Sequence, residues 1–385
     1  MRGVKRRKNR TPDTTAQPLP VLGPPTDRAI AARIRRMVEA ARKIVITGHE
    51  RPDGDCIGSE VALCAILRAA GFDAAVVNSD PPAAKYRFLT ASCPTRDGRR
   101  HTAPVPVRTV GERAAALNAD LVFVLDATTL QRLGRVTPLL ADGAARIVNL
   151  DHHQGNQVPG DVNWVDSRAA ATAELVWRLA ACCRWPVPFV ALQALYTALV
   201  TDTGQFSYFN TSTRVLRMAA GLVERGVNPE AIWQRVYLNK SPGELALDAR
   251  ARASLRSAAG GRIAYIALRR RDFEATGTTP QQTEEMATIP RALAGVELSL
   301  FFYAIAGGRQ TKVSMRSGPR VDVAALARQF GGGGHRQAAA CALDMGLQQA
   351  IKTFLPVAER YIAQVRPGRT AGCVRSCPRR SSSDP

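Results

Sequence analysis

Two imidazoles and a carboxylate follow one short apolar segment of the chain. Asp151, His152 and His153 come directly after residues 147–150, so the sequence places them at the end of a predicted β-strand. Strand ends are where α/β sheets build ligand sites. Imidazole and carboxylate together are the donors that borderline divalent ions such as Mn²⁺ accept. The triplet therefore indicates a metal or catalytic site.

Other acidic and imidazole side chains fall at element ends in the same way. Segments 44–47 and 121–125 read as buried strands and segment 190–201 reads as a helix, and each is followed by at least one carboxylate. Taken alone, each such residue is also explained as a turn former or a helix cap. Their joint occurrence in one α/β region favours a metal site. The candidate ligands are His49, Asp53, Asp55, Asp126, His152 and Asp202.

The spacing within this set suits a pair of ions. Asp53 and Asp55 stand two residues apart in a predicted loop, so each can face a different ion, and a pair of ions needs a carboxylate to bridge them. Gly58 and Ser59 stand where the next helix is expected to begin, and free N–H groups at a helix start can meet a phosphate. His101 lies in a polar, turn-rich segment and is expected to be solvated.

The elements that must position these residues alternate between strand and helix. A helix at 58–70, ended by Gly71, and a strand at 74–78 follow the first strand, and helices at 169–183 and 190–201 follow the strands that end at Asp126 and Asp151. This alternation predicts an α/β fold with a doubly wound, mainly parallel sheet. From residue 259 the pattern changes to a smaller α+β domain with a mixed sheet. Its strands are expected at 262–268, 296–305 and 311–316, and its helices at 281–294, 321–330 and 347–365.

The domain boundaries follow from these patterns. We expect a disordered basic, proline-rich arm at 1–27, a catalytic domain at 28–240 and a helical linker at 241–258. The second domain is expected at 259–365 and a disordered basic tail at 366–385. The active site is expected in the cleft between the two domains.

Composition narrows the class of protein. The net charge is +21, with +6 from residues 1–10, +4 from 366–385 and +11 from the remainder. This favours polyanionic partners, although 46 arginines against 7 lysines also fit a biased codon usage. No apolar run is long enough for a membrane helix, and the eight cysteines form no disulfide framework. The basic leader is not followed by an apolar stretch, so we expect a cytoplasmic protein, with a transit peptide as the minor alternative.

These motifs resemble those of the DHH family of phosphoesterases. His49-x-x-x-Asp53-x-Asp55 matches the family's first motif, Asp126 the second, the triplet at 151–153 the third and Asp202 the fourth. Segments 311–317, 321–324 and 331–339 are similar to the DHH-associated C-terminal domain. Within the family, the chain most resembles the NrnA-like group of nanoRNases and pAp phosphatases. One departure is Ala340, which stands where the family usually has glycine, and it puts the close packing of that loop in question.

The resemblance implies a role for each candidate ligand. His49 and Asp53 would hold one ion, a second set would hold the other, and Asp126 would bridge the two. The second set is Asp55, His152 and Asp202. Mn²⁺ is the family's usual ion, with Mg²⁺ or Co²⁺ as further possibilities. Of the expected catalytic residues besides Asp126, Asp151 would orient a ligand and His153 would face the scissile phosphate.

A second group of residues is expected to grip the substrate. By itself, the glycine run after Phe330 reads as a flexible helix terminator, but the motif around it favours contact with a terminal phosphate or nucleotide. The candidate substrate-binding residues are Ser59, Arg316, Ser317, Gly332, Gly333, Gly334 and His335.

The resemblance implies an enzyme that trims very short RNA and dephosphorylates 3′-phosphoadenosine 5′-phosphate. Its partners would be short RNA oligonucleotides and nucleotide bisphosphates, without a membrane and with a possible homodimer. Alternatives are a cyclic-di-AMP or pApA phosphodiesterase and a RecJ-like single-strand exonuclease, although RecJ-like enzymes are usually longer. A further alternative, which is not an enzyme, is an RNA-binding module. Such a module would have no use for six metal ligands.

Overall fold

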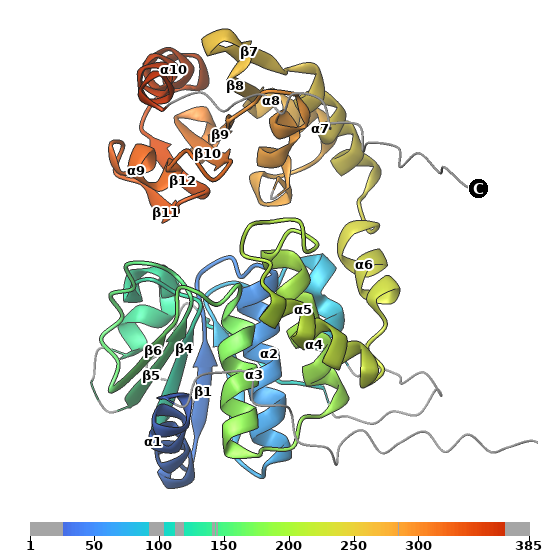
Figure 1. Cartoon of the computed structure of the whole chain (residues 1–385), viewed down its shortest axis with the longest axis vertical. Helices are drawn as coiled ribbons and strands as arrows, with labels where there is room; N and C mark the ends of the chain where they lie inside the picture. The colour runs from blue at the N-terminus through green and yellow to red at the C-terminus, as the bar shows by residue number, and fades with distance from the viewer. Residues whose placement is uncertain are drawn as a thin grey trace, which may run out of the picture. The chain divides into compact units, whose positions relative to one another are not determined.

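The chain folds into two compact units, residues 1–239 and 240–385, which are described separately (Figure 1). This computed structural model describes residues 26–91, 104–111, 119–140, 143, 145–283 and 285–365. His101, the expected tail at 366–385 and all but the last two residues of the expected arm at 1–27 lie outside the described residues. None of the described helices is long and apolar enough to cross a membrane.

The first unit is built on a six-stranded parallel sheet, as predicted. Its order is β3-β2-β1-β4-β5-β6. The strands are β1 Ile44–Thr47, β2 Ala74–Asn78, β3 Val107–Thr109, β4 Leu121–Leu125, β5 Arg146–Asp151 and β6 Val162–Val165. The strand order reverses between β1 and β4, and the carboxyl ends of strands at such a point form a natural crevice.

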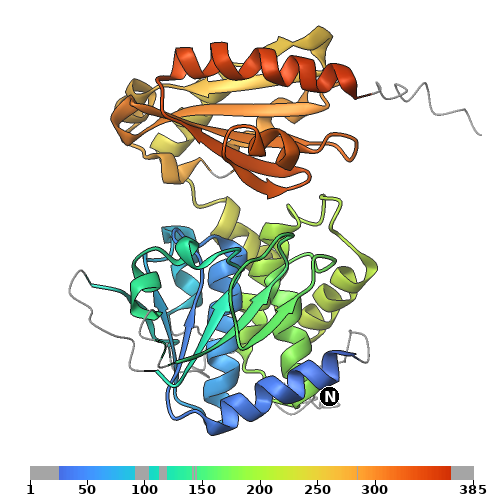
Figure 2. The same ribbon diagram turned by 90° about the vertical axis from the view of Figure 1, so that its left-hand side faces the viewer.

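Both faces of this sheet are covered, which explains the continuous apolar character of its strands. Leu121, Phe123 and Leu125 of β4 face one core, while Val122 and Val124 face the other. The first core is closed by α1 Thr26–Ala40, α2 Gly54–Ala69, α3 Thr172–Cys183 and α4 Phe189–Asp202 (Figure 2). The second is closed mainly by the 3₁₀ segment η2 Leu130–Leu140. The remaining helical elements of this unit are η1 Ala84–Leu89, α5 Thr213–Glu224 and α6 Pro229–Tyr237.

A buried ion network fixes α1, which the sequence had not indicated. The Arg178 guanidinium on α3 donates two hydrogen bonds of 2.7 Å to Asp27 on α1. It donates a third, of 2.8 Å, to Asp166, which follows β6. The Arg178 side chain is only 2% exposed. One cation therefore joins α1 to α3 and to the segment after β6, both of which are distant from α1 in sequence.

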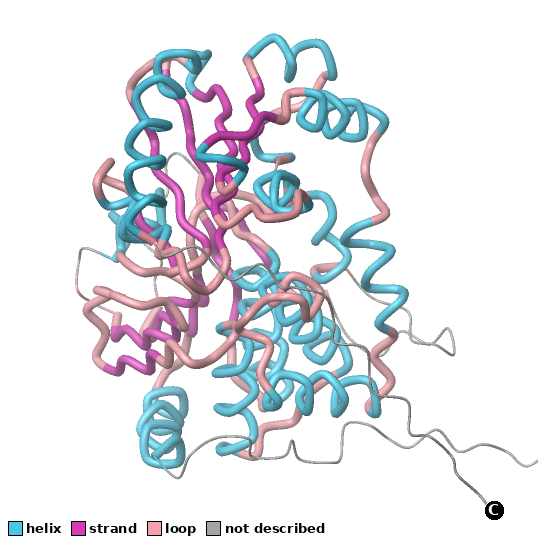
Figure 3. The backbone as a smooth tube through the Cα atoms, turned by 45° about the horizontal axis from the view of Figure 1, so that its top comes forward, coloured by secondary structure: helices cyan, strands magenta, loops and turns pink. Residues whose placement is uncertain are grey.

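The second unit contains a mixed six-stranded sheet of order β11-β12-β10-β9-β8-β7 (Figure 3). All neighbouring strands are antiparallel except β8 and β9. The strands are β7 Arg256–Ala258, β8 Ile263–Leu268, β9 Leu298–Ile305, β10 Gln310–Ser317, β11 Gly333–His335 and β12 Ala338–Leu343. Helices α9 Val323–Arg328 and α10 Leu347–Gln364 pack on one face. The other face holds α7 Pro242–Ala253 and α8 Arg270–Thr276.

Several sequence predictions about the elements were wrong. Residues 281–294 are not an α-helix but the 3₁₀ segments η4 Pro280–Gln282 and η5 Met286–Ala292, because Pro290 has no N–H to donate within a helix. Residues 256–258, expected to be helical, form the edge strand β7. Strands β3, β6, β11 and β12 were not anticipated either. The alanines of β12 favour a helix, and its strand conformation is set by pairing with β10.

Candidate metal centre

The acidic and imidazole residues of the first unit meet at the point where the strand order reverses. Asp126 follows β4, and His49 stands two residues beyond β1. His152 follows β5, the next strand in the sheet. The amino-terminal end of α2 supplies Asp53 and Asp55, and the last residue of α4 is Asp202. The structure therefore brings together all six candidate ligands.

His152 lies among three carboxylates. Its Nε2 is 3.4 Å from Asp126 Oδ1. It is 3.7 Å from Asp55 Oδ2 and also 3.7 Å from Asp202 Oδ2. These separations exceed ordinary hydrogen-bond lengths. Two ligands held about 2.1 Å from one cation at tetrahedral angles lie roughly 3.4 Å apart, so the spacing suits donors around an ion.

His49 forms a second group on the other side of Asp126. Its Nε2 lies 3.7 Å from Asp53 Oδ2 and 3.7 Å from Asp126 Oδ2. Its Nδ1 is 2.8 Å from the Glu50 carbonyl oxygen, to which it can donate a hydrogen bond. That bond keeps the proton on Nδ1, so Nε2 is the nitrogen that would lose its proton to ligate a metal.

Asp126 connects the two groups. Its Oδ2 faces His49 and its Oδ1 faces His152, so one carboxylate presents an oxygen to each group. Its backbone has a φ of 55°, a left-handed conformation that costs a non-glycine residue on the order of 1 kcal/mol. The Thr172 hydroxyl donates a 3.1 Å hydrogen bond to Oδ1. The fold thus maintains a strained backbone to hold this carboxylate in position.

The electrostatics of the cluster favour a bound cation. Burial and the neighbouring Asp126 carboxylate raise the pKa of Asp55 well above its ordinary value. Burial also raises the pKa of Asp202 to about 6. Burial lowers the pKa of His49, but the Asp53 and Asp126 carboxylates outweigh it and raise that pKa to about 9. In the metal-free cluster, these carboxylates and the imidazole therefore hold on to their protons, which offset the negative charge of the neighbouring carboxylates. Bound divalent ions would supply positive charge instead. The donor set fits borderline divalent ions.

Asp151 and His153 form a hydrogen-bonded pair at the edge of the cluster, where His153 Nδ1 also lies 3.5 Å from Asp126 Oδ1. Asp151 is fully buried, and its Oδ1 accepts a 2.7 Å hydrogen bond from His153 Nδ1. Its other oxygen accepts one of 2.6 Å from the Asn156 amide. Burial raises the pKa of Asp151, but these hydrogen bonds outweigh it and lower the pKa to about 2. The imidazole that Asp151 orients is therefore that of His153, and the His153 side chain is 24% exposed.

The amino-terminal end of α3 completes the surroundings of Asp55. The N–H groups of Thr172 and Ala173 donate hydrogen bonds of 2.6 and 3.1 Å to its carboxylate. Such N–H groups stabilise an anion at a helix start. Ser59 is fully buried and its hydroxyl donates to Asp55 Oδ1 at 2.9 Å. The expectation that Ser59 contacts the substrate is therefore corrected. Because α2 begins at Gly54, Ser59 lies one turn inside the helix.

Three residues at this site were missed by sequence reasoning. Thr172 and Asn156 carried only a weak signal, as a polar residue near a helix start and an asparagine in a turn. Cys56 follows Asp55 and carried no signal as a ligand, yet its Sγ lies within 4.8 Å of ligand atoms of His49 and Asp126. That thiol is 3.6 Å from Glu60 Oε1, in a buried layer beneath the cluster.

The candidate grip residues lie in the second unit. Arg316 on β10 is half-buried, and its guanidinium donates to the Met315 carbonyl oxygen at 2.9 Å. Ser317 is fully buried and its hydroxyl donates to the Val321 carbonyl oxygen at 2.7 Å. Ser317 therefore stabilises a turn, which corrects the expectation that it binds substrate. His335 lies in β11, with its backbone paired to Ala338.

Two glycines of the run, Gly332 and Gly334, allow close backbone packing in the second sheet. A Cβ at Gly332 would lie 2.2 Å from the Ala340 carbonyl oxygen, and one at Gly334 would lie 2.5 Å from that of Ala338. Only Gly333 of these three has open space around its Cα. Gly333 pairs with Ala340, so the Ala340 methyl group faces a residue without a side chain. The departure at Ala340 is thereby accommodated.

An aromatic side chain stands in the loop that follows Asp202. Phe209 is 66% exposed. The next residue, Asn210, donates hydrogen bonds of 3.0 and 3.1 Å from its amide to the carbonyl oxygens of Asp202 and Ala170. Gln205 and Phe206 both have a positive φ, of 60° and 61°. The loop is thus anchored beside a candidate ligand while it presents an aromatic ring to solvent.

Family models match both units. The DHH family N-terminal domain matches residues 43–199, and the DHHA1 domain matches residues 260–364. The chain belongs to the DHH family of phosphoesterases. As such it is a hydrolase that acts on phosphoester bonds.

Similar proteins agree with this assignment. The chain is 29% identical to a bifunctional oligoribonuclease and PAP phosphatase from Thermus thermophilus, over 85% of this chain and 91% of that protein. It is 24% identical to the Bacillus subtilis protein of the same name, over 78% of this chain and 89% of that one. The fold is similar to that of an exopolyphosphatase-related protein from Bacteroides fragilis. That match has a TM-score of 0.76 at 23% identity and covers 87% of this chain and 96% of that one.

Proposed function

We propose that this DHH phosphoesterase works with two divalent ions. His49 and Asp53 would hold one ion, and Asp126 would lie between the two. The residues that would hold the other are Asp55, His152 and Asp202. The observation that carries the proposal is the position of Asp126, whose two carboxylate oxygens face His49 on one side and His152 on the other. A bridging carboxylate is what a two-ion phosphoesterase needs.

The chain's own residues would bind and orient the phosphoester. Bound ions supply Lewis acidity and lower the pKa of bound water. Asp151 accepts a hydrogen bond from His153 Nδ1. The other ring nitrogen of His153, Nε2, would then donate a proton to a phosphoryl oxygen of the substrate. Asp151 is ionised and buried, and its hydrogen bond to Nδ1 fixes the orientation of the imidazole. His153 is therefore the proposed catalytic group, and Asp151 positions it.

We propose very short RNA and 3′-phosphoadenosine 5′-phosphate as the substrates. The names of the relatives from Thermus thermophilus and Bacillus subtilis support this choice. The net charge of +21 also favours a polyanionic substrate. Mixed imidazole and carboxylate donors suit Mn²⁺, with Mg²⁺ or Co²⁺ as substitutes. Arg316, the backbone at Gly333 and His335 remain the proposed grip on a terminal phosphate or nucleotide.

One experiment tests ion use and substrate class together. Metal-stripped protein is reconstituted with Mn²⁺ and offered five substrates in parallel: pApA, a five-nucleotide RNA, pAp, cyclic-di-AMP and a long single-stranded DNA. We expect the fastest turnover with pApA or the short RNA, and measurable turnover of pAp. Faster cleavage of cyclic-di-AMP or of long DNA would favour the corresponding phosphodiesterase or exonuclease.

The matched variants are Asp126→Asn and Asp248→Asn, the second lying on α7 in an ion pair with Arg252. Asp126→Asn removes a charge between the two groups and should lower kcat at least a thousandfold, with metal content reduced. Asp248→Asn should leave both unchanged. Full activity of Asp126→Asn in the presence of a chelator would refute the two-ion proposal, and no hydrolysis of any substrate would favour the binding-module alternative.

A further inference from the structure

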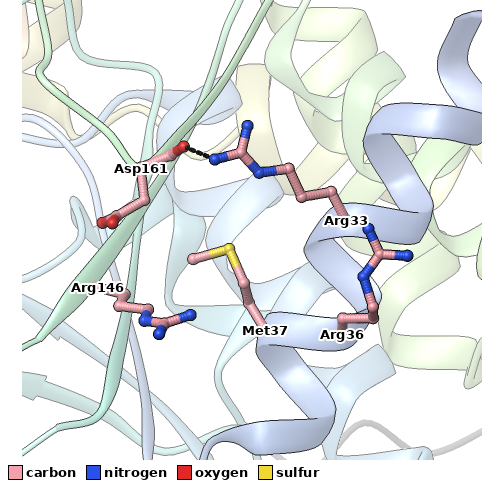
Figure 4. Close-up of a pocket in the computed structure, with 5 residues that line it drawn as sticks. All are labelled: Arg33, Arg36, Met37, Arg146 and Asp161. Carbon is pink, nitrogen blue, oxygen red and sulfur yellow. Dashed lines mark hydrogen bonds between the residues drawn. The ribbon is translucent and has the colours of Figure 1, made fainter.

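A cavity of about 290 Å³ lies at the end of β5 opposite to the metal cluster. Figure 4 shows its lining side chains. Arg33, Arg36 and Met37 line it from α1, Arg146 from the first position of β5, and Asp161 from the segment before β6. β5 runs from Arg146 to Asp151, so about 17 Å separates the cavity from the triplet at a rise of about 3.3 Å per residue. The cavity is therefore separate from the candidate metal centre.

The walls of this cavity are held in place by buried or backbone hydrogen bonds. The two bonds from Arg178 to Asp27 fix α1 against α3. Arg33 Nη2 donates a 2.7 Å hydrogen bond to the Asp161 carbonyl oxygen (Figure 4). The Asp161 carboxylate accepts one of 2.8 Å from the Ile147 N–H. Helix and loop are thus tied together around the cavity.

The charges around the cavity are unbalanced. Three guanidinium groups line it against one carboxylate, and that carboxylate is directed to a backbone N–H of β5. Among the described residues, Arg33, Arg36 and Arg146 form no ion pair with any acidic side chain, whereas Arg35 on the same helix is paired with Glu39. Convergent cations around a hollow attract an anion. Guanidinium groups match the geometry of phosphate oxygens, to which they bind in a bidentate manner.

The cavity has one apolar side chain, Met37, among its mainly polar lining. Met37 is only 8% exposed, and its thioether lies between Arg36 and Arg146 (Figure 4). A volume of about 290 Å³ is near the lower end for small-molecule sites, which combine an apolar surface with a few convergent polar groups. A ligand with one phosphate and an adjoining sugar or base fits both features better than a bare multivalent anion does.

We infer that this cavity binds the phosphate of a nucleotide at a second site, remote from the metal cluster. The nucleotide is either a free 5′-mononucleotide or the terminal residue of an RNA strand, since both present the same phosphate chemistry. The inference does not depend on catalysis at the metal cluster, because binding at this cavity requires only α1, β5 and the loop before β6.

The test uses full-length, chelator-treated protein, with binding measured by isothermal titration calorimetry. The probes are 5′-AMP, inorganic phosphate and a twelve-nucleotide single-stranded RNA. The test variant is Arg36→Gln/Arg146→Gln, and the charge-matched control is Arg35→Gln/Arg217→Gln. All four side chains are exposed, but those of the control do not line the cavity. Glutamine keeps helix propensity at the three helical positions, and thermal unfolding checks the folding of all variants, including the change at Arg146 in β5.

We expect the test variant to lose about tenfold or more in affinity for 5′-AMP, and the control to bind like the wild type. Each lost guanidinium removes a charge-assisted hydrogen bond to phosphate. A comparable loss with inorganic phosphate confirms the phosphate contact, and a loss seen with the RNA alone assigns the site to a strand end. Unchanged affinity for all three probes would overturn the inference. Cleavage of pApA by the test variant stays at the wild-type rate, so failure here is distinguishable from failure of the proposed function.

Discussion

Binding of divalent ions to the metal-free protein should release protons. The number of protons released at one ion position can be worked out from the pKa of His49. The pKa of His49 is raised to about 9 in the absence of metal. At pH 7.5 such a group is almost fully protonated, with only about 3% neutral. An imidazole must lose its proton to ligate a metal. Occupation of the His49 position should therefore release close to one proton, and His152, whose pKa is also raised, should add to it when the second ion binds.

The same shift predicts how affinity and stability change with pH. Below a pKa of about 9, each pH unit should raise the apparent affinity at the His49 position about tenfold, and the rise should level off above pH 9. For the metal-free protein, a folded-state pKa above the unfolded value means that the stabilisation is complete below about pH 6.5 and is lost as pH rises through 9. Metal-free protein should therefore lose stability over this window, whereas metal-loaded protein should not.

Isothermal titration calorimetry of Mn²⁺ binding at pH 7.5 is carried out in PIPES, HEPES and Tris. Because these buffers differ in ionisation enthalpy, the heats of binding give the number of protons that the protein releases. His49→Gln should lower the proton count by about one and reduce the stability loss between pH 6.5 and 9, with His152 accounting for the remainder. Asp248→Asn is the control and should behave like the wild type. Binding that releases no protons at pH 7.5, or an affinity that does not change between pH 6.5 and 8.5, would refute this account of the cluster.

Three further predictions concern single side chains. Arg178→Met leaves Asp27 and Asp166 without their cation and should lower the free energy of unfolding in urea by about 3–5 kcal/mol; a change below about 1 kcal/mol would contradict a structural role for this network. Ser59→Ala should lower kcat several-fold through Asp55 while KM for pApA stays the same, and a raised KM with unchanged kcat would show that Ser59 does contact substrate. Phe209→Ala should raise KM for pApA about tenfold by removing a surface on which a base can stack, while Phe209→Trp retains it. The matched probe is an analogue without bases, and an equal effect on that analogue would exclude stacking.

The strands and donors of the first unit could be predicted because their signals are local. A strand buried on both faces, such as β4, must be apolar at every position, and the carboxylate after it marks the strand end. The helix expected at 281–294 and the missed strand β12 show where local signals fail. Pro290 prevents the first, and the alanines of β12 become a strand only through pairing with β10.

The sequence by itself determined which donors this protein has and that they stand at element ends. Only the tertiary structure decided which of them face one another. Asp126 lies between His49 and His152 because the strand order reverses between β1 and β4. Ser59 and Ser317 are buried supports and not substrate contacts, because burial depends on what packs over a residue. The α3 amino terminus that meets Asp55 likewise comes from a segment that only folding brings to the start of α2.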